Sequence, residues 1–201
     1  MLARFIFIGI LLASFSVGHA QKQVTALDKD THLKMLKKGV LLIRLSDQGA
    51  KIKALQERGR TKEADELIEE TKSLNELIVS TFNQYYNYSK VNFINPEDCK
   101  QIVKDKSKTV TDIISGESID LSSSNVYFTD YGIGNPADSY ERYNRKGFQI
   151  FALENGQIVN LGRDLFYAGV KQGFFVGPFD KSMAKTVVKL NKRLAVGSKY
   201  F

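Results

Sequence analysis

Several residue types on which protein chemistry often depends are scarce in this sequence. Its 201 residues include one cysteine, two histidines and no tryptophan. A single cysteine cannot close a disulfide within the chain or supply a CxxC pair, which excludes paired-thiol redox chemistry. His19 lies in a predicted leader, so the mature chain would keep only His32, and a zinc site of several histidines and cysteines is excluded. Without tryptophan, carbohydrate binding by ring stacking is less favoured.

The first 20 residues have the pattern of a secretory signal peptide. Arg4 precedes a nine-residue apolar run, Phe5–Ala13, and the small residues Gly18 and Ala20 fit cleavage after Ala20. The run is far shorter than the ~20 residues that span a bilayer, and no later apolar stretch approaches that length. We therefore expect an exported protein, periplasmic or extracellular, that is soluble and has no transmembrane segment in its mature chain.

The mature chain is basic and long enough for one domain. Without residues 1–20 it has 181 residues and a net charge of +6, because Arg4 is the only charged residue of the leader. A chain of this size buries roughly 70% of its unfolded surface, which suffices for a core without disulfides. We predict an N-terminal arm over residues 21–38 and a single α/β domain over residues 39–201.

Short apolar runs and helical periodicity predict the elements of this domain. Strands are expected over residues 39–45, 90–94, 125–131, 148–153 and 157–161. Helices are expected over residues 31–38, 47–58, 62–85, 96–104 and 181–196. Thr61 and Asp180 are expected to cap the starts of the third and the last of these helices. Residues 106–124 are expected to be partly irregular, and residues 132–146 to form a polar loop.

This order of elements predicts an α/β or α+β fold. We expect a central mixed sheet of about four to five strands, with a long helical pair inserted after the first strand and a C-terminal helix. The early strand–helix–strand units can be parallel, whereas the strands that flank Asn155-Gly156 must form an antiparallel hairpin.

Three segments of the chain together form a pattern typical of one family. They are Val40–Leu45 leading into a helix, the stretch from Tyr131-Gly132-Ile133 and Pro136 to Asn155-Gly156 and Gln157–Val159, and the closing helix Asp180–Leu194. This pattern resembles the thioredoxin-like fold, particularly its exported, membrane-associated bacterial variants. Where that family has its redox CxxC, this chain has Ser46-Asp47-Gln48-Gly49, and eleven residues separate Pro136 from its strand. The resemblance therefore implies a scaffold without redox activity, which would most simply be a binding module.

Cys99 is the one weak candidate for a catalytic residue. It lies in the first turn of the helix that Asn95-Pro96 begins, where the helix dipole favours a thiolate while Glu97 and Asp98 oppose it. It could be a single reactive thiol or form a disulfide between chains. The alternative is a small buried apolar residue, since free cysteine is among the most buried residue types.

The remaining signals for a cofactor or a metal are weak. His32 stands among three lysines, at positions 34, 37 and 38, in a setting expected to be solvated and poor for a general base. Residues 132–137 match G-x-G-x-x-A, but no helical stripe follows to direct amides at a pyrophosphate. No spacing of oxygen ligands resembles an EF-hand loop. We therefore expect no cofactor and no metal.

Aromatic residues in and near loops are the best candidates for a recognition surface. The expected binding residues are Tyr131, Asn135, Tyr140, Tyr143, Phe166, Tyr167, Phe174 and Phe175. Glycines beside the aromatics of residues 166–175 would leave room for a ligand to approach. The alternative for most of these side chains is that they fill the core.

A basic stripe follows one side of the last helix. It consists of Lys181, Lys185, Lys189 and Lys192. The stripe could face an anionic surface such as phospholipid or an acidic glycan, or it could be the solvated back of an amphipathic helix. Because no aromatic residues interrupt it, specific nucleic-acid recognition is not expected.

These observations favour a non-catalytic binding or scaffolding module of the bacterial envelope or exterior, with an unknown protein or small ligand as its partner. The alternative is an enzyme, either a single-thiol redox protein that uses Cys99 or a carboxylate-based hydrolase that uses two acids near the predicted loops. Candidates for such a pair are Asp130, Asp138, Glu141 and Asp164. A third possibility is an electrostatic binder of anionic polymer or lipid.

Overall fold

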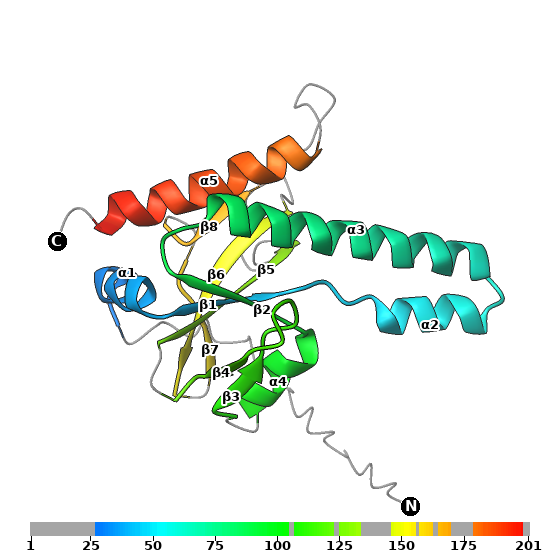
Figure 1. Ribbon diagram of the computed structural model, residues 1–201, viewed down its shortest axis with the longest axis horizontal. Coiled ribbons are helices and arrows are strands. Elements are labelled where there is room, and N and C mark those ends of the chain that lie inside the picture. Colours follow the sequence, from blue (N-terminus) through cyan, green and yellow to red (C-terminus); the bar gives the residue numbers. More distant parts are fainter. Residues whose placement is uncertain are drawn as a thin grey trace, which may run out of the picture.

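The structure is a computed structural model that describes residues 27–104, 107–122, 125–133, 146–155, 157–162, 165–169 and 179–198. Figure 1 shows helices on both sides of a sheet. The helices are α1 (Lys29–Lys38), α2 (Gly49–Glu57), α3 (Thr61–Tyr85), α4 (Pro96–Lys104) and α5 (Phe179–Gly197). The strands are β1 (Val40–Arg44), β2 (Lys90–Ile94), β3 (Thr109–Thr111), β4 (Ser118–Asp120), β5 (Val126–Ile133), β6 (Lys146–Glu154), β7 (Gln157–Asn160) and β8 (Tyr167–Gly169).

Within the described residues the sheet is mixed and about five strands wide, as the sequence predicted. Its order is β2-β1-β5-β6-β7. β8 pairs with residues 147–149 of β6, and β7 pairs with residues 151–154 of the same strand. β1 runs parallel to both β2 and β5, with Arg44 opposite Ile94 on one side and Asp130 on the other. β6 is antiparallel to β5, β7 and β8. The fold class is therefore α/β with an antiparallel hairpin edge, in agreement with the prediction.

β1 is buried on both faces and divides the core in two. Leu41 and Ile43 point into the larger cluster, to which α1, α3 and α5 contribute. Val40 and Leu42 point into the smaller cluster, which α4 and the β3–β4 hairpin cover. Successive side chains of a strand alternate between faces, so a strand of four fully apolar residues requires cover on each side.

The two connections that leave the parallel strands pass over opposite faces of the sheet. From β1 the chain runs through α2 and α3, and α3 packs Ile78 and Phe82 into the larger cluster. From β2 it runs through α4, which packs Cys99 and Ile102 into the smaller cluster. Figure 1 shows α3 on one side of the strands and α4 on the other. The carboxyl ends of β1 and β2 therefore lie where the two connections diverge to opposite faces of the sheet, and Asp130 of β5 lies beside them, opposite Arg44.

The predicted N-terminal arm contains a helix that is part of the domain core. Leu33 and Leu36 of α1 are completely buried in the larger cluster. Asp28 caps the helix, since its side chain accepts a hydrogen bond from the Thr31 amide at 2.7 Å. Gly39 ends it, and a side chain there would strike the backbone oxygen of Asn125. Residues 29–38 are thus packed against the sheet.

Local sequence signals located most of the element boundaries. α3 begins one residue before the predicted range, and β2 and α4 have the predicted bounds. The predicted capping roles are wrong in detail, because Thr61 lies inside α3 and Asp180 lies in the first turn of α5. Asn155 has a φ of 51°, the left-handed conformation expected between β6 and β7.

The β3–β4 hairpin falls in a segment predicted to be partly irregular. Asp112 accepts hydrogen bonds from the amides of Phe93, Ile114 and Ser115, each at 2.8 Å. The hairpin is therefore fixed to β2 by a buried carboxylate, an interaction that its short, polar strands do not reveal. Separately, no helix among the described residues is both long enough and apolar enough to cross a bilayer.

Truncating α1 tests whether this helix belongs to the domain. We expect Leu36→Ala to lower the free energy of unfolding by about 2–5 kcal/mol, because the residue is fully buried and leaves a cavity. The exposed neighbour Lys37 provides the control, and Lys37→Ala should change the stability by no more than about 0.5 kcal/mol. Urea unfolding measures both values, and equal effects would show that α1 does not pack on the sheet.

Candidate functional site

A cleft lies at the carboxyl ends of the parallel strands, where the two connections separate. Its volume is about 300 Å³. Open α/β sheets commonly bind ligands at this place, because the loops that leave the two strands diverge to opposite faces and leave a crevice between them. We call this the switch-point cleft. Its lining residues are Arg44, Leu45, Ser46, Asp47, Pro96, Glu97, Asp130 and Tyr131.

Charged side chains from three elements meet in the switch-point cleft. Arg44 ends β1 and donates a hydrogen bond to the carboxylate of its register partner Asp130, with both side chains partly exposed. Asp47 follows β1, and Glu97 lies in the first turn of α4. Three carboxylates therefore line the cleft against one guanidinium, which gives it a negative formal charge.

The loop that forms one wall of the cleft is held in place by α3. Asn75 accepts a hydrogen bond from the Ser46 amide at 2.9 Å and donates one to the Ser46 carbonyl oxygen at 3.0 Å. Asp47 accepts a hydrogen bond from the Gly49 amide at 2.8 Å, which leads the chain into α2. With its backbone groups bonded in this way, the loop is ordered before any ligand binds.

Cys99 lies close to the Arg44–Asp130 pair but is buried. Only 5% of its surface is exposed. Burial raises the pKa of the Cys99 thiol; Arg44 opposes this increase, and Asp130 adds a smaller increase than the decrease from Arg44. The helix dipole therefore does not produce a reactive thiolate, and Cys99 belongs to the smaller core cluster.

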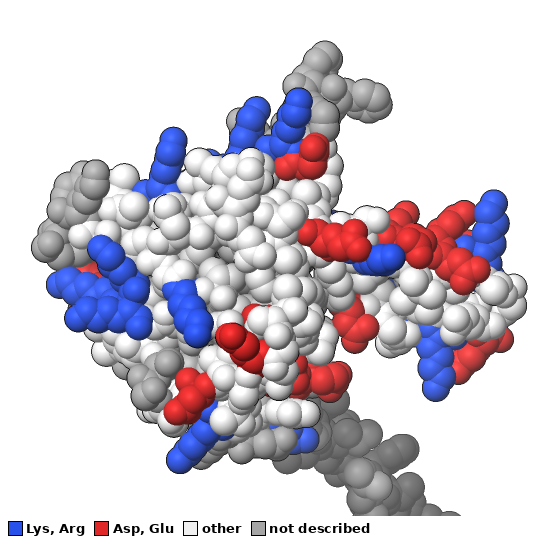
Figure 2. All heavy atoms as spheres, in the orientation of Figure 1, with Lys and Arg blue, Asp and Glu red and all other residues white. Residues whose placement is uncertain are grey.

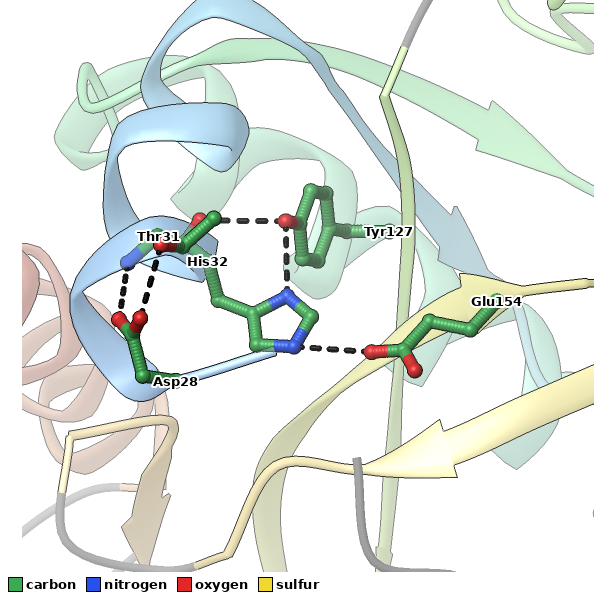
Figure 3. Close-up of polar contacts among 5 residues, drawn as sticks. All are labelled: Asp28, Thr31, His32, Tyr127 and Glu154. Atoms are coloured by element: carbon green, nitrogen blue, oxygen red, sulfur yellow. Dashed lines mark hydrogen bonds and ion pairs between the residues drawn. The ribbon is translucent and has the colours of Figure 1, made fainter. Parts of the chain in front are cut away.

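A second polar group lies at the opposite end of β5. His32 of α1 places Nε2 2.9 Å from Oε1 of Glu154 on β6 and Nδ1 3.1 Å from the hydroxyl of Tyr127 on β5. The Tyr127 hydroxyl also donates to the His32 carbonyl oxygen at 3.1 Å. Figure 3 shows the imidazole held between the two side chains, with Asp28 and Thr31 at the start of the helix. These contacts bind α1 to the sheet.

The burial of His32 overturns the expectation of a solvated setting. Only 1% of the residue is exposed, since it lies on the same side of α1 as Leu33 and Leu36. Desolvation lowers the pKa of His32, although Glu154 acts in the opposite direction. His32 is the only histidine that the structure describes, and Tyr127 precedes Asp130 by three residues, or about 10 Å of strand. The imidazole therefore cannot act as a general base in the switch-point cleft.

The predicted binding residues are distributed among different environments. Tyr131 lines the switch-point cleft and packs against the rings of Phe148 and Phe179, at centroid distances of 5.6 and 6.1 Å. Phe166 is completely buried in the core, so it offers no recognition surface, and Tyr167 is half-buried on β8. The other predicted positions lie outside the described residues; they are Asn135, Tyr140, Tyr143, Phe174 and Phe175.

The basic stripe on α5 lies on the exposed side of that helix. Lys181, Lys185, Lys189 and Lys192 are exposed. The opposite side, with Met183 and Leu190 among its residues, is completely buried in the larger cluster. Figure 2 shows basic side chains along this edge of the molecule. The amphipathic pattern is confirmed, while binding of an anionic surface stays a prediction.

The sequence analysis missed most of the switch-point cleft. No role in binding was assigned to Arg44, Asp47 or Glu97. Each of them lies at or near the junction between a strand and the helix that follows it. That position at the carboxyl end of a predicted parallel strand is the signal that could have identified them. Among the residues whose structure is described, no group of three or more histidine, cysteine, aspartate or glutamate side chains is arranged to hold a metal ion.

Comparison with known proteins identifies no relative. No family model, curated protein or solved structure matches this chain. The resemblance to the thioredoxin-like fold therefore stays a prediction, and Pro136, one of the residues on which it depends, lies outside the described residues.

The accessibility of Cys99 can be measured by thiol labelling. Because the thiol is buried and its pKa is raised, we expect labelling of the folded protein at pH 8 to be at least about a hundredfold slower than in denaturant. The variant Cys99→Ser/Ser73→Cys provides an exposed thiol on α3 that should react rapidly. Rapid labelling of Cys99 in the folded protein would contradict its burial and restore the single-thiol hypothesis.

The stability of the protein should depend on the protonation of His32. Its lowered pKa means that the unfolded chain binds a proton near pH 6.5 before the folded protein does. The stabilisation is complete above pH 6.5 and decreases as the pH falls, by at most about 1.4 kcal/mol per pH unit.

Urea unfolding between pH 7.5 and pH 5 measures this dependence. His32→Gln should reduce the slope below pH 6.5, because the imidazole no longer titrates. Lys37→Gln, on the exposed side of the same helix, should retain the wild-type slope. Parallel profiles for the wild type and His32→Gln would show that the imidazole does not govern acid stability.

Proposed function

We propose that this protein is an exported, non-catalytic binding protein that holds a small organic cation in the switch-point cleft. The observation that carries the proposal is the cleft itself, with three carboxylates and one guanidinium at the carboxyl ends of β1 and β2 and on the neighbouring strand β5. Its volume of about 300 Å³ is at the lower end of the range for small-molecule sites.

The charge of the cleft supports a ligand with an ammonium or guanidinium group. Arg44 is already paired with Asp130, and Asp47 adds a further carboxylate to the lining. In the described part of the chain these carboxylates do not form a group suited to a metal ion. An organic cation is long enough to reach carboxylates on separate walls, and Tyr131 adds an aromatic ring to the lining.

Export and the missing chemistry support the same proposal. The predicted signal peptide over residues 1–20 would place the protein in the periplasm or outside the cell. Cys99 is buried and His32 lies at the other end of β5, so neither group serves the cleft. Because neither the thiol nor the imidazole reaches the cleft, the proposal is a protein that binds its ligand without converting it.

A carboxylate-based hydrolase is the second candidate function. It is favoured by one observation, the presence of Asp47, Glu97 and Asp130 in the same cleft. Two carboxylates in such a position can serve as acid and base or as nucleophile. The binding function is preferred because Asp130 is held by Arg44.

Thermal unfolding in the presence of a compound panel tests the proposed function. The panel contains L-arginine, spermidine and choline as cations, and glucose and citrate as neutral and anionic controls. A ligand at a hundred times its Kd adds about 2.7 kcal/mol of stability, which raises the Tm of a chain of this size by about 5–10 °C. We expect at least one of the cations, and neither control, to produce this increase.

The variant Asp47→Asn removes one charge from the cleft while keeping an oxygen for the Gly49 amide. It should weaken binding of the cation by about tenfold. Asp120→Asn is the matched control, because Asp120, at the end of β4 and outside the cleft, accepts the equivalent bond from the Ser122 amide. Equal effects of both variants, or no increase in Tm with any cation, would refute the proposal. Chemical breakdown of a compound during incubation with the wild-type protein, but not with Asp47→Asn, would favour the hydrolase.

A further inference from the structure

The α2–α3 pair extends beyond the sheet, and we call it the α2–α3 arm to distinguish it from the N-terminal arm of residues 21–38. Figure 1 shows α2 and the first half of α3 to one side of the strands, while the second half of α3 lies over them. All residues of this pair are described, and none in α2 is buried. In α3, Ala64 is the only buried residue before Ile78. The arm thus covers little of the domain core with its own apolar residues.

An apolar groove lies where the arm joins the domain. Its volume is about 580 Å³. Its apolar side chains come from α2, α3, the segment after β1 and the β3–β4 turn, and they are Leu45, Ile52, Ile68, Val79 and Ile114. Ile68 and Ile114 are 39% and 54% exposed, respectively. Exposed isoleucines that converge on one groove mark an interaction site more strongly than isolated ones do.

The walls of the groove are fixed by hydrogen bonds. Asp112 accepts the amide hydrogens of Ile114 and of Phe93 on β2, so the position of Ile114 is set by the sheet. Asn75, which also lines the groove, holds both backbone groups of Ser46. A binding partner would meet a surface that is already formed, which lowers the entropic cost of association.

One flank of the groove is acidic although the protein is basic overall. Lys72 and Glu76 line the groove, and Asp65 and Glu69 continue the same stripe of α3 toward its start at helical spacing. Asp47 adds a carboxylate at the end near β1. Figure 2 shows acidic side chains along the arm, with basic ones among them and toward its tip. Two carboxylates and one lysine thus line the groove, and Asp65 and Glu69 extend the acidic stripe of α3 beyond it.

We propose that this groove binds an amphipathic helix of a partner protein, with the apolar face of that helix on Ile68 and Ile114 and its lysine or arginine side chains along the acidic flank. The apolar floor favours leucine-like anchors at helical spacing, which is the usual mode of helix-in-groove recognition. The carboxylates favour positive charge beside those anchors and disfavour anionic lipid or nucleic acid. The proposal does not rest on a ligand in the switch-point cleft, although Asp47 lines both cavities.

Fluorescence anisotropy with a synthetic peptide tests this partner chemistry. The probe is a labelled peptide of about 18 residues in which leucines recur at helical spacing and the remaining positions are lysine. A second peptide carries glutamate in place of every lysine. We expect the lysine peptide to bind at least about tenfold more tightly than the glutamate peptide, and to weaken as NaCl is raised.

Two pairs of variants locate the binding site. Ile68→Ser removes an apolar anchor and should weaken binding about tenfold. Its control is Ile158→Ser on β7, since Ile158 is 38% exposed and lies outside the groove. Glu76→Lys should also weaken binding about tenfold, whereas Glu70→Lys makes the same change of charge on the opposite side of α3 and should have little effect.

The outcomes divide clearly between support and refutation. Selective loss in Ile68→Ser and Glu76→Lys supports the proposal, and the Glu76/Glu70 pair decides alone if Ile68→Ser fails to fold. Equal binding of both peptides, or equal losses in variants and controls, overturns it. Self-association of the wild-type protein that Ile68→Ser abolishes, measured by light scattering without peptide, would place a second copy in the groove and also overturn the proposal.

Discussion

The burial of β1 on both faces is the constraint on which the rest of the structure depends. Val40 to Ile43 are apolar, and each is at least 97% buried, so the sheet must be covered on two sides. The chain meets this requirement by sending α3 over one face and α4 over the other. A strand with one polar face would need cover on a single side, and the two connections would have no reason to diverge.

Divergence of those connections creates both candidate binding regions. The switch-point cleft opens between the segments that follow β1 and β2, beside Asp130 and Tyr131 of β5, and the groove opens where the α2–α3 arm joins the domain. Residues 45–47 line both cavities, and Asn75 fixes this shared wall from α3. The two regions differ in chemistry, since one is lined by charged side chains and the other by isoleucines, so they suit ligands of different kinds.

The sequence predicted the parts of the fold that local interactions determine. Asn95-Pro96 ends β2 and begins α4, so both bounds were predicted correctly. The β3–β4 hairpin was missed because Asp112 holds it through the amide of Phe93, 19 residues away. Arg44 and Asp130 are separated by 86 residues and meet only through the register of β1 and β5. His32 was misjudged because its neighbouring lysines are solvated while its own side of α1 faces the sheet.

The location of the bound ligand tests the switch-point cleft most directly. Backbone amide shifts of the isotopically labelled protein can be recorded by NMR during titration with L-arginine and with spermidine. The proposed function predicts that the largest changes occur in residues 44–47, 97, 130 and 131, which line the cleft. Changes centred on His32 and Glu154 at the other end of the sheet, or no changes with either compound, would contradict it.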